Sequence, residues 1–224
     1  MKATGPTRIP NYLRRAKSQE AMLEAALRLF VRKGYGATTV DEIAEATGLT
    51  KGAVYFYFGD KAGLLAALIG RAESQIYAPM IHQMKEAGDP IDQIVQYLHW
   101  ISQKGVVAAN LLLLPILISL EFKGKNDAIV GSVSGIYDSL HQALEDTIAR
   151  GQKSGVIHRK VPPREMAAVV ISLTDGALLE FLRRGKRLDG PKFVRALRTT
   201  LLSGFLAAPT LKRQRGETAA GRGT

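Results

Sequence analysis

Residues 39–61 read TVDEIAEATGLTKGAVYFYFGDK, and this stretch decides the fold of the N-terminal part of the chain. Thr39 stands three residues before Glu42, which is the spacing of a capping box at the start of a helix. One buried stripe then follows at helical spacing, formed by Val40, Ile43, Ala44 and Thr47. Gly48 suits the left-handed residue that ends a helix, and Thr50 can cap the next one. The stretch therefore predicts a helix, a glycine turn and a second helix.

The second helix of this pair is predicted to have one apolar face and one face suited to a phosphate backbone. Val54 and Phe58 stand four residues apart on the apolar side. The other sides carry the ammonium of Lys51 and two tyrosine hydroxyls, which can reach phosphate oxygens. Gly52 and Ala53 would let the helix backbone come close to a groove wall. An ordinary amphipathic helix with tyrosines at the edge of a core is the alternative.

The wider context favours a small DNA-reading head. Residues 20–69 resemble the DNA-binding head of the tetracycline-repressor (TetR) family, over about a quarter of the chain and without a gap. The matching runs are A-x-x-L-F-x-x-x-G-Y, T-T-V-x-x-I-A-x-x-x-G-L-T and G-x-x-Y-x-Y-F-x-x-K-x-x-L-L. Taken together these runs are specific, whereas any one of them alone would be weak.

The resemblance implies an all-helical homodimer whose larger C-terminal half binds an effector and holds the dimer together. By position, it implies DNA contacts at Thr39, Thr50, Lys51, Gly52, Ala53, Tyr55, Tyr57 and Lys61. Members of the family often have a longer polar residue where Gly52 and Ala53 stand. We therefore expect few side chains of this protein to read bases directly.

The formal net charge of +11 is concentrated at the two ends of the chain. Residues 1–61 hold 10 Lys and Arg against 6 Asp and Glu, and residues 183–224 hold 11 against 2. We interpret residues 1–17 as a basic arm that either follows the DNA or remains a solvated tail. Residues 209–224 lack apolar spacing and are expected to be a disordered basic tail.

Apolar spacing beyond the head predicts helices, with no alternating strand pattern. The expected helices span residues 61–88, 90–104, 106–122, 126–151, 163–184 and 191–207. The expected fold class is therefore all-α, with a three-helix helix-turn-helix head and a larger C-terminal helical domain. We assign the head to residues 18–62, and a ligand-binding and dimerisation domain to residues 63–208.

The last two expected helices carry the residues assigned to a dimer interface. Gly176 stands in the middle of its helix, where glycine costs about 1 kcal/mol relative to alanine, so a close helix approach is expected there. TetR-like proteins dimerise through their last two long helices as a four-helix bundle. This implies an interface at Leu173, Ala177, Phe181, Leu197 and Leu201. The alternative is that the same stripe belongs to the core of one protomer.

Large apolar groups with isolated polar tips predict a pocket for a small hydrophobic or aromatic effector. The expected lining is Tyr77, Met80, Met84, Tyr97, Trp100, Leu113, Leu117, Phe122, Tyr137 and His141. Pro115 frees a carbonyl and bends its apolar helix, which favours a cavity. Methionines adapt to varied ligand shapes. A close-packed helical core without a cavity is the alternative.

Signals for catalysis and for metal binding are weak, so no enzyme activity, cofactor or metal is expected. In the run GSVSG, Val133 stands where a nucleophile elbow requires serine. Two His–Glu pairs supply only two metal ligands each: His82 with Glu86, and His141 with Glu145. Glu121 and Asp175 lie in apolar stretches, where a carboxylate must be paired, protonated or exposed to a cavity.

These patterns indicate a DNA-binding transcriptional regulator, interpreted as a repressor that binds a palindromic operator as a dimer and is released by the effector. The alternative is a DNA-binding protein whose C-terminal domain docks a partner protein. No signal peptide is recognised, and the apolar run 106–122 falls short of the ~20 residues of a membrane span. A cytoplasmic location without a membrane partner is therefore expected.

Overall fold

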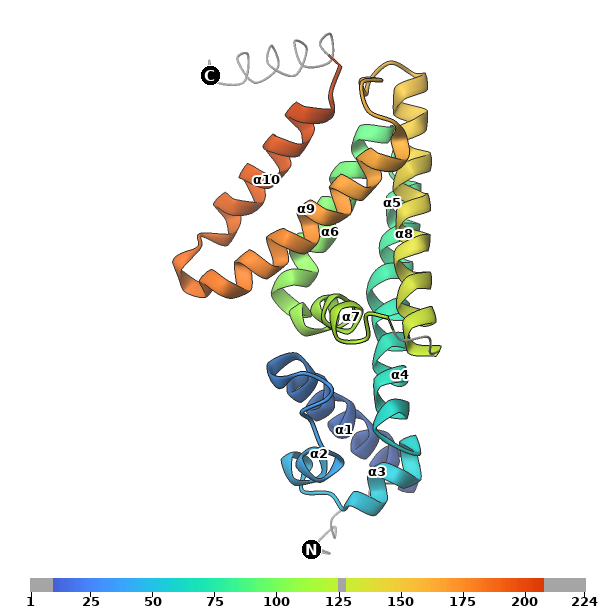
Figure 1. The fold of residues 1–224 in the computed structure, drawn as a ribbon, viewed down its shortest axis with the longest axis vertical. Helices are drawn as coiled ribbons and strands as arrows, with labels where there is room; N and C mark the ends of the chain where they lie inside the picture. Colours follow the sequence, from blue (N-terminus) through green and yellow to red (C-terminus); the bar gives the residue numbers. More distant parts are fainter. Residues whose placement is uncertain (1–9, 125–127, 208–224) are drawn as a thin grey trace, which may run out of the picture.

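The computed structural model describes residues 10–124 and 128–207, and the elements named in that part of the chain are all helices (Figure 1). This confirms the all-α prediction. The head contains α1 (Asn11–Lys33), α2 (Val40–Thr47) and α3 (Lys51–Phe58). The predicted disordered tail at residues 209–224 lies outside the described residues.

Helix α1 begins earlier than the sequence analysis assumed. No proline or glycine interrupts the chain between Pro10 and Gly34, so helix is favoured over this whole stretch. Three of the residues assigned to a basic arm therefore lie on the first turns of α1: Arg14, Arg15 and Lys17. Residues 1–9 of the proposed arm are outside the described part of the chain. The first helix of the head thus extends into the segment that the sequence analysis assigned to the arm.

The head has one core, to which α4 (Lys61–Ala72) contributes a full face. Its buried side chains are Met22, Ala26, Phe30, Ile43, Val54, Leu64, Leu65 and Leu68. On the outside, Arg71 of α4 forms ion pairs with Glu20 and Glu24 of α1. These contacts anchor α1 to α4, the helix that leaves the head.

The expected long helix over residues 61–88 is present, but it is not regular. After α4 the chain forms one π-helical turn, η1 (Glu73–Tyr77), and continues as α5 (Ala78–Glu86). Pro79 lies at the start of α5 and has no N–H to donate to the preceding turn. A widened turn just before a proline is a known way to accommodate that lost hydrogen bond.

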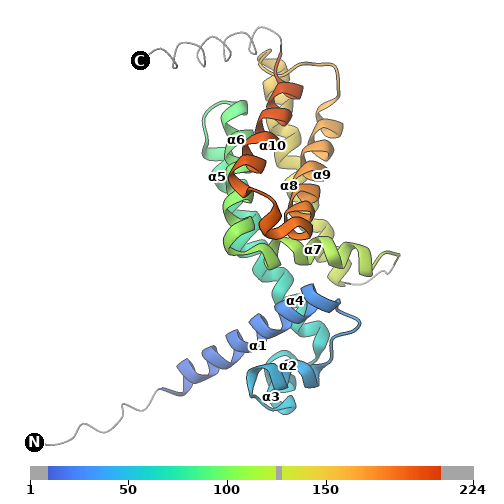
Figure 2. The ribbon, with the colours of Figure 1, turned by 90° about the vertical axis from the view of Figure 1, so that its left-hand side faces the viewer.

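Helices α6 (Pro90–Val107) and α7 (Ala109–Glu121) meet at Ala108 with a bend of 101°. The expected boundary before Val106 is therefore wrong by about one turn, because α6 continues to Val107. Helix α7 lies across the top of the head, against α1 and α4 (Figures 1 and 2). This places the end of α7 beside the DNA-binding unit.

The remaining helices are α8 (Ala128–Lys153), α9 (Pro163–Arg184), the short η2 (Gly185–Arg187) and α10 (Gly190–Phe205). Helices α8 and α9 pack side by side, whereas α10 is the outermost element and diverges from α9 along its length (Figures 1 and 2). Within the described ranges, no single helix has both the length and the hydropathy to cross a membrane. Two pairs of consecutive helices reach that length and hydropathy only when both helices of the pair are counted together, and each pair is bent by more than 40°.

Candidate DNA-binding and effector sites

The start of the helix-turn-helix is built as the sequence predicts. The Glu42 backbone N–H donates to Thr39 Oγ1 at 3.2 Å, and the Thr39 N–H donates to the Glu42 carboxylate at 2.8 Å. Lys33 also donates to this carboxylate, and the two partners lower the pKa of Glu42 to about 2. Gly48 ends α2 with φ +66°, the left-handed conformation expected of it. The predicted capping box and glycine turn are confirmed.

The outward face of α3 carries the exposed side chains of Lys51 and Tyr55 and the bare backbone at Gly52. The Lys51 ammonium lies 3.0 Å from the Asp41 carboxylate, and this hydrogen bond raises the pKa of Lys51. Phe56 is also on this face and is 72% exposed. The sequence analysis missed Phe56, although it stands four residues after Gly52 and therefore on the same side of the helix.

The other predicted contact residues of α3 are less exposed. Thr50 Oγ1 accepts from the Ala53 N–H at 3.2 Å, so its hydroxyl caps the helix. Ala53 and Tyr57 are half-buried, and the Tyr57 ring packs edge-on against Phe56 with ring centroids 5.0 Å apart. The N-terminal part of α3, where Lys51 and Gly52 are exposed, thus faces away from the head core.

Lys61 has partners inside the protein. Its ammonium donates to the backbone carbonyls of Tyr35 at 2.9 Å and Thr38 at 2.8 Å, with a longer contact to Gly36. It also lies over the Tyr35 ring, 4.3 Å from the centroid. The structure therefore favours a role for Lys61 in holding the α1–α2 turn (residues 34–38). This differs from the phosphate contact that the sequence resemblance implied.

In the C-terminal domain, six of the ten predicted effector residues are buried, namely Phe122 at the end of α7 and five others. Tyr77, Met80, Met84, Tyr97 and Leu113 are all buried in the core. The Tyr97 hydroxyl is 2.7 Å from Thr174 Oγ1, and burial raises the pKa of this tyrosine. At these positions the geometry is closer to the core alternative than to a pocket wall.

Asp175 forms a second polar contact in the same region. The Tyr137 hydroxyl donates to its carboxylate at 3.2 Å, and the Tyr137 ring lies near Tyr77 with centroids 6.4 Å apart. Burial raises the pKa of Asp175 to about 6, although the bond from Tyr137 opposes this shift. Burial also raises the pKa of Tyr137 and of Tyr77. The Asp175 carboxylate, which the sequence analysis singled out, is thus hydrogen-bonded to Tyr137.

The other predicted pocket residues are placed differently. Trp100 is half-buried, and its indole Nε1 is buried without a hydrogen-bond partner among the described residues. Leu117 is also half-buried, whereas Phe122 lines a small cavity of about 130 Å³ at the end of α7. His141 lies 3.7 Å from Glu145 on one helix face. The structure does not bring all ten residues together around one cavity.

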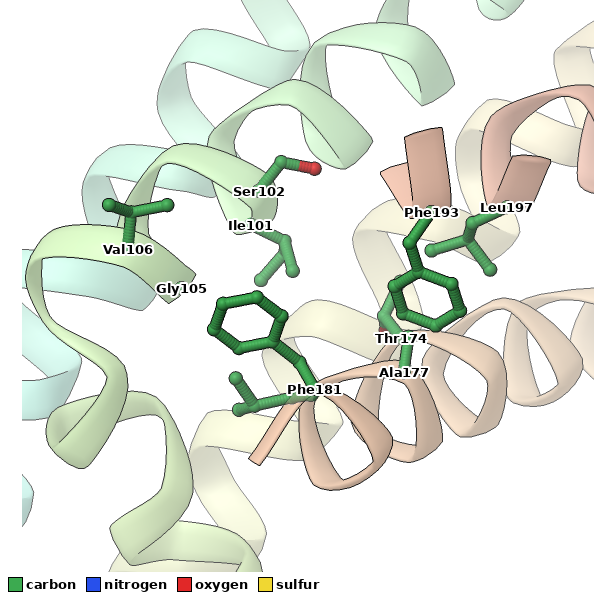
Figure 3. Close-up of a pocket in the computed structure, with 10 residues that line it drawn as sticks. Ile101, Ser102, Gly105, Val106, Thr174, Ala177, Phe181, Phe193 and Leu197 are labelled. Atoms are coloured by element: carbon green, nitrogen blue, oxygen red, sulfur yellow. The ribbon is translucent and has the colours of Figure 1, made fainter. Parts of the chain in front are cut away.

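A distinct pocket lies between α6, α9 and α10 (Figure 3). It is lined almost entirely by apolar groups, with Thr174 and Ser102 as its polar side chains, and encloses about 60 Å³. The lining residues are Ile101, Ser102, Gly105, Val106, Thr174, Ala177, Leu178, Phe181, Phe193 and Leu197. Because Thr174 also contacts Tyr97, the pocket adjoins the buried tyrosine cluster.

The predicted dimer residues divide into three groups. Ala177, Phe181 and Leu197 line this pocket within one protomer, and Leu201 is buried. Leu173 is 39% exposed on α9. Val169 and Leu182 are also exposed on α9 and were absent from the predicted set. Four of the five residues therefore lie inside one protomer, as the core alternative expects, and Leu173 is exposed.

The weaker sequence signals stay apart from both sites. His82 and Glu86 form an exposed pair 3.4 Å apart, as expected of a solvated helix face. In the part of the chain that the structure describes, no group of three or more His, Cys, Asp or Glu side chains could hold a metal.

These features define a helix-turn-helix DNA-binding protein with a larger helical domain attached through α4. Residues 22–68 match the family model described as "Bacterial regulatory proteins, tetR family". The MbdR regulator from Azoarcus sp. CIB is similar in structure, with a TM-score of 0.78 and 37% identity over 85% of this chain and 100% of that one. The chain belongs to the TetR family and is a transcriptional regulator.

Two other proteins show how far the similarity extends. The transcriptional regulator AcrR of Shigella flexneri is 26% identical over 88% of this chain and 93% of its own. The structure of AibR in complex with isovaleryl coenzyme A and operator DNA has a TM-score of 0.72 and 19% identity, over 83% of this chain and 98% of that one. The second similarity concerns the fold alone.

Proposed function

We propose that this regulator is a repressor that binds a pseudo-palindromic DNA operator as a homodimer and is released by a small hydrophobic or aromatic effector. The observation that carries the proposal is the outward face of α3. It presents a cation, a tyrosine hydroxyl and a glycine backbone at the end of the molecule farthest from α10 (Figure 1). Such a face fits a DNA groove, because phosphate contacts set the register of the helix on the duplex.

The proposed DNA contacts follow from exposure on the head. Lys51 would exchange its exposed bond to Asp41 for a phosphate, and Gly52 would let the backbone approach the groove. The remaining proposed contacts are Thr39, Thr50, Ala53, Tyr55 and Tyr57, with Phe56 added for apolar contact to a thymine methyl. We assign Lys61 to the support of the head instead, because its ammonium already binds backbone carbonyls.

The dimer interface is proposed to use the exposed face of α9 together with α10. Val169 and Leu173, one helical turn apart, expose apolar surface on one face of α9, and the outermost position of α10 leaves it open to a second copy (Figure 2). Exposed apolar side chains on neighbouring turns of a helix favour an association surface. A dimer would present two copies of α3 to half-sites about one helical turn apart.

The effector is proposed to bind between α6, α9 and α10, with the Thr174 hydroxyl as a polar anchor. The cavity of about 60 Å³ is far smaller than the roughly 300–1,000 Å³ of typical ligand pockets. An effector must therefore separate α10 from α6 as it enters. AibR, which has the same fold, binds the acyl thioester isovaleryl coenzyme A. An acyl or aromatic ligand is the matching chemistry for this apolar lining.

The test is selection of bound DNA from a random duplex pool, followed by gel-shift titration against acyl and aromatic compounds. We expect a pseudo-palindromic site, and at least one compound that releases it. Trp100 is the sole tryptophan and directly precedes the pocket residue Ile101, so a change in its fluorescence reports binding near the pocket. If compounds that change Trp100 fluorescence leave operator affinity intact, the effector part of the proposal fails. A selected site without two-fold symmetry would refute the dimeric mode. We place this activity in the cytoplasm, where the operator DNA is found.

A further inference from the structure

The α1–α2 turn is held by a carboxylate from the C-terminal domain. Glu121 is the last residue of α7, and its side chain accepts from the backbone N–H of Tyr35 at 2.9 Å and of Gly36 at 2.5 Å. Two successive N–H groups that face one anion form a concave anion-binding site in the backbone. Because the acceptor is ionic, these hydrogen bonds are stronger than neutral ones. The turn belongs to the head, so this contact joins the two domains.

The glycines of the turn make room for this carboxylate. A Cβ atom on Gly36 would lie 3.0 Å from Glu121 Oε1, closer than almost any ordinary contact. A Cβ atom on Gly34 would lie 3.4 Å from Glu121 Oε2. Gly34 also has φ +88°, a conformation that other residues rarely adopt. At Gly36, a side chain would therefore have to push the Glu121 carboxylate aside.

The same turn is fixed on its other sides. Lys61 binds its carbonyls, as described above. The Tyr35 ring lies between Phe30 of the head and Phe122, with ring centroids 5.3 Å apart in each pair. Because Phe122 directly follows Glu121, the end of α7 holds the turn through an apolar contact and an ionic one. The turn cannot shift relative to α7 without breaking both.

The position of this turn affects both helices of the DNA-binding unit. Thr39, the cap of α2, follows the turn directly, and α2 in turn leads into α3. At its other end α7 joins α6, whose residues Ile101 and Val106 line the proposed effector pocket. A movement of α6 caused by a ligand would therefore reach the head through Glu121.

We propose that Glu121 is a positioning residue for DNA binding, because its carboxylate fixes the α1–α2 turn and thereby the orientation of α3 relative to the C-terminal domain. This inference rests on the proposed operator binding. Loss of the contact lets the head adopt orientations that do not fit both half-sites. The apparent affinity then falls with the fraction of molecules in the binding-competent orientation.

The test compares Glu121→Gln and Glu121→Ala with the control Glu86→Gln, which removes a charge from an exposed pair on α5. We expect faster hydrogen exchange at the amides of Tyr35 and Gly36 in both Glu121 variants, measured on the full chain without DNA. We also expect about tenfold weaker binding to the selected operator duplex, equivalent to about 1.4 kcal/mol. The control should leave both quantities unchanged.

The sign of the affinity change separates this role from simple electrostatics. Removing a negative charge from a DNA-binding protein should by itself strengthen its attraction to phosphates. The positioning role predicts weaker binding instead, with an unchanged dependence on salt, because no phosphate contact is lost.

Gly36→Ala tests the same contact from the side of the turn and does not depend on the folding of a Glu121 variant. Its methyl group should displace the carboxylate and reproduce both effects. The double variant should be no weaker in binding than either single one, because both changes break one interaction. Unchanged exchange at Tyr35 and Gly36 in Glu121→Ala would overturn the contact, even if no operator were found. Faster exchange with unchanged operator affinity would overturn the positioning role.

Discussion

Replacing Lys61 by Met should destabilise the protein far more than it changes the electrostatics of DNA binding. The variant keeps an unbranched apolar stem and loses two charge-assisted hydrogen bonds, to the carbonyls of Tyr35 and Thr38. Such bonds are worth about 1.5–3 kcal/mol each. Because Lys61 is only half-buried, we take the lower part of that range and expect a loss of about 3 kcal/mol for the pair. For a chain of this size the melting temperature should fall by roughly 6–12 °C.

Lys51→Met is the matched comparison, because it removes the same charge from the neighbouring helix. Its bond to Asp41 is exposed and screened by solvent, so the unfolding free energy should change far less than in Lys61→Met. If Lys51 contacts a phosphate in each protomer, a dimer loses two such contacts. The slope of log K against log salt should then decrease by about 1.8, from about 0.9 per phosphate.

The assays are denaturant unfolding of the full chain, and operator titration at four or more salt concentrations. Lys61→Met should lose much stability and keep the wild-type salt slope. Lys51→Met should keep its stability and have a smaller salt slope. If Lys61→Met keeps wild-type stability but decreases the slope by about two, its ammonium binds DNA and our reasoning is refuted.

Three further outcomes follow from the C-terminal domain. Asp175→Asn should abolish a pH dependence of stability. Burial raises the pKa of Asp175 in the folded protein from an ordinary 3.8 to about 6. The wild type should therefore lose about 3 kcal/mol of stability in total as the pH rises through that interval. Urea unfolding between pH 4 and 8 measures this loss, and an equal loss in the Asn variant would assign it to another group. Leu173→Arg should give monomers in sedimentation and abolish operator binding, because it charges the exposed face of α9; an intact dimer would place the interface elsewhere. Ala177→Trp should fill the α6–α9–α10 pocket, so the variant should bind the operator but resist release by the effector in a gel shift. Release at wild-type effector concentrations would locate the effector in another cavity.

The helix-turn-helix could be predicted because its signals are local. The bonds between Thr39 and Glu42, and between Thr50 and Ala53, join residues three apart in sequence, and Gly48 ends α2 by its own backbone freedom. Interactions over three or four residues depend on neighbours that the sequence displays directly. The same holds for α9, whose predicted start at Pro163 and end at Arg184 agree with the structure.

Residue roles that depend on distant partners were decided by the tertiary structure. The spacing around Lys61 fits a phosphate contact, but folding brings its ammonium to carbonyls more than 20 residues away. Ala177 on α9 and Leu197 on α10 have the spacing of an interface, yet with residues of α6 they line a pocket inside one protomer. A stripe of apolar residues specifies that a face is covered, and the packing of other helices decides what covers it.

Glu121 shows this division most clearly. The sequence by itself determined that a carboxylate in so apolar a helix must be paired, protonated or exposed to a cavity. In the structure Glu121 is exposed and paired. The partner lies 86 residues earlier, at the amides of the α1–α2 turn, and nothing near Glu121 in the sequence points to it. The bend at Ala108 and the packing of α7 across α1 create that contact, since only the folded chain brings the two amides within hydrogen-bonding distance of the carboxylate.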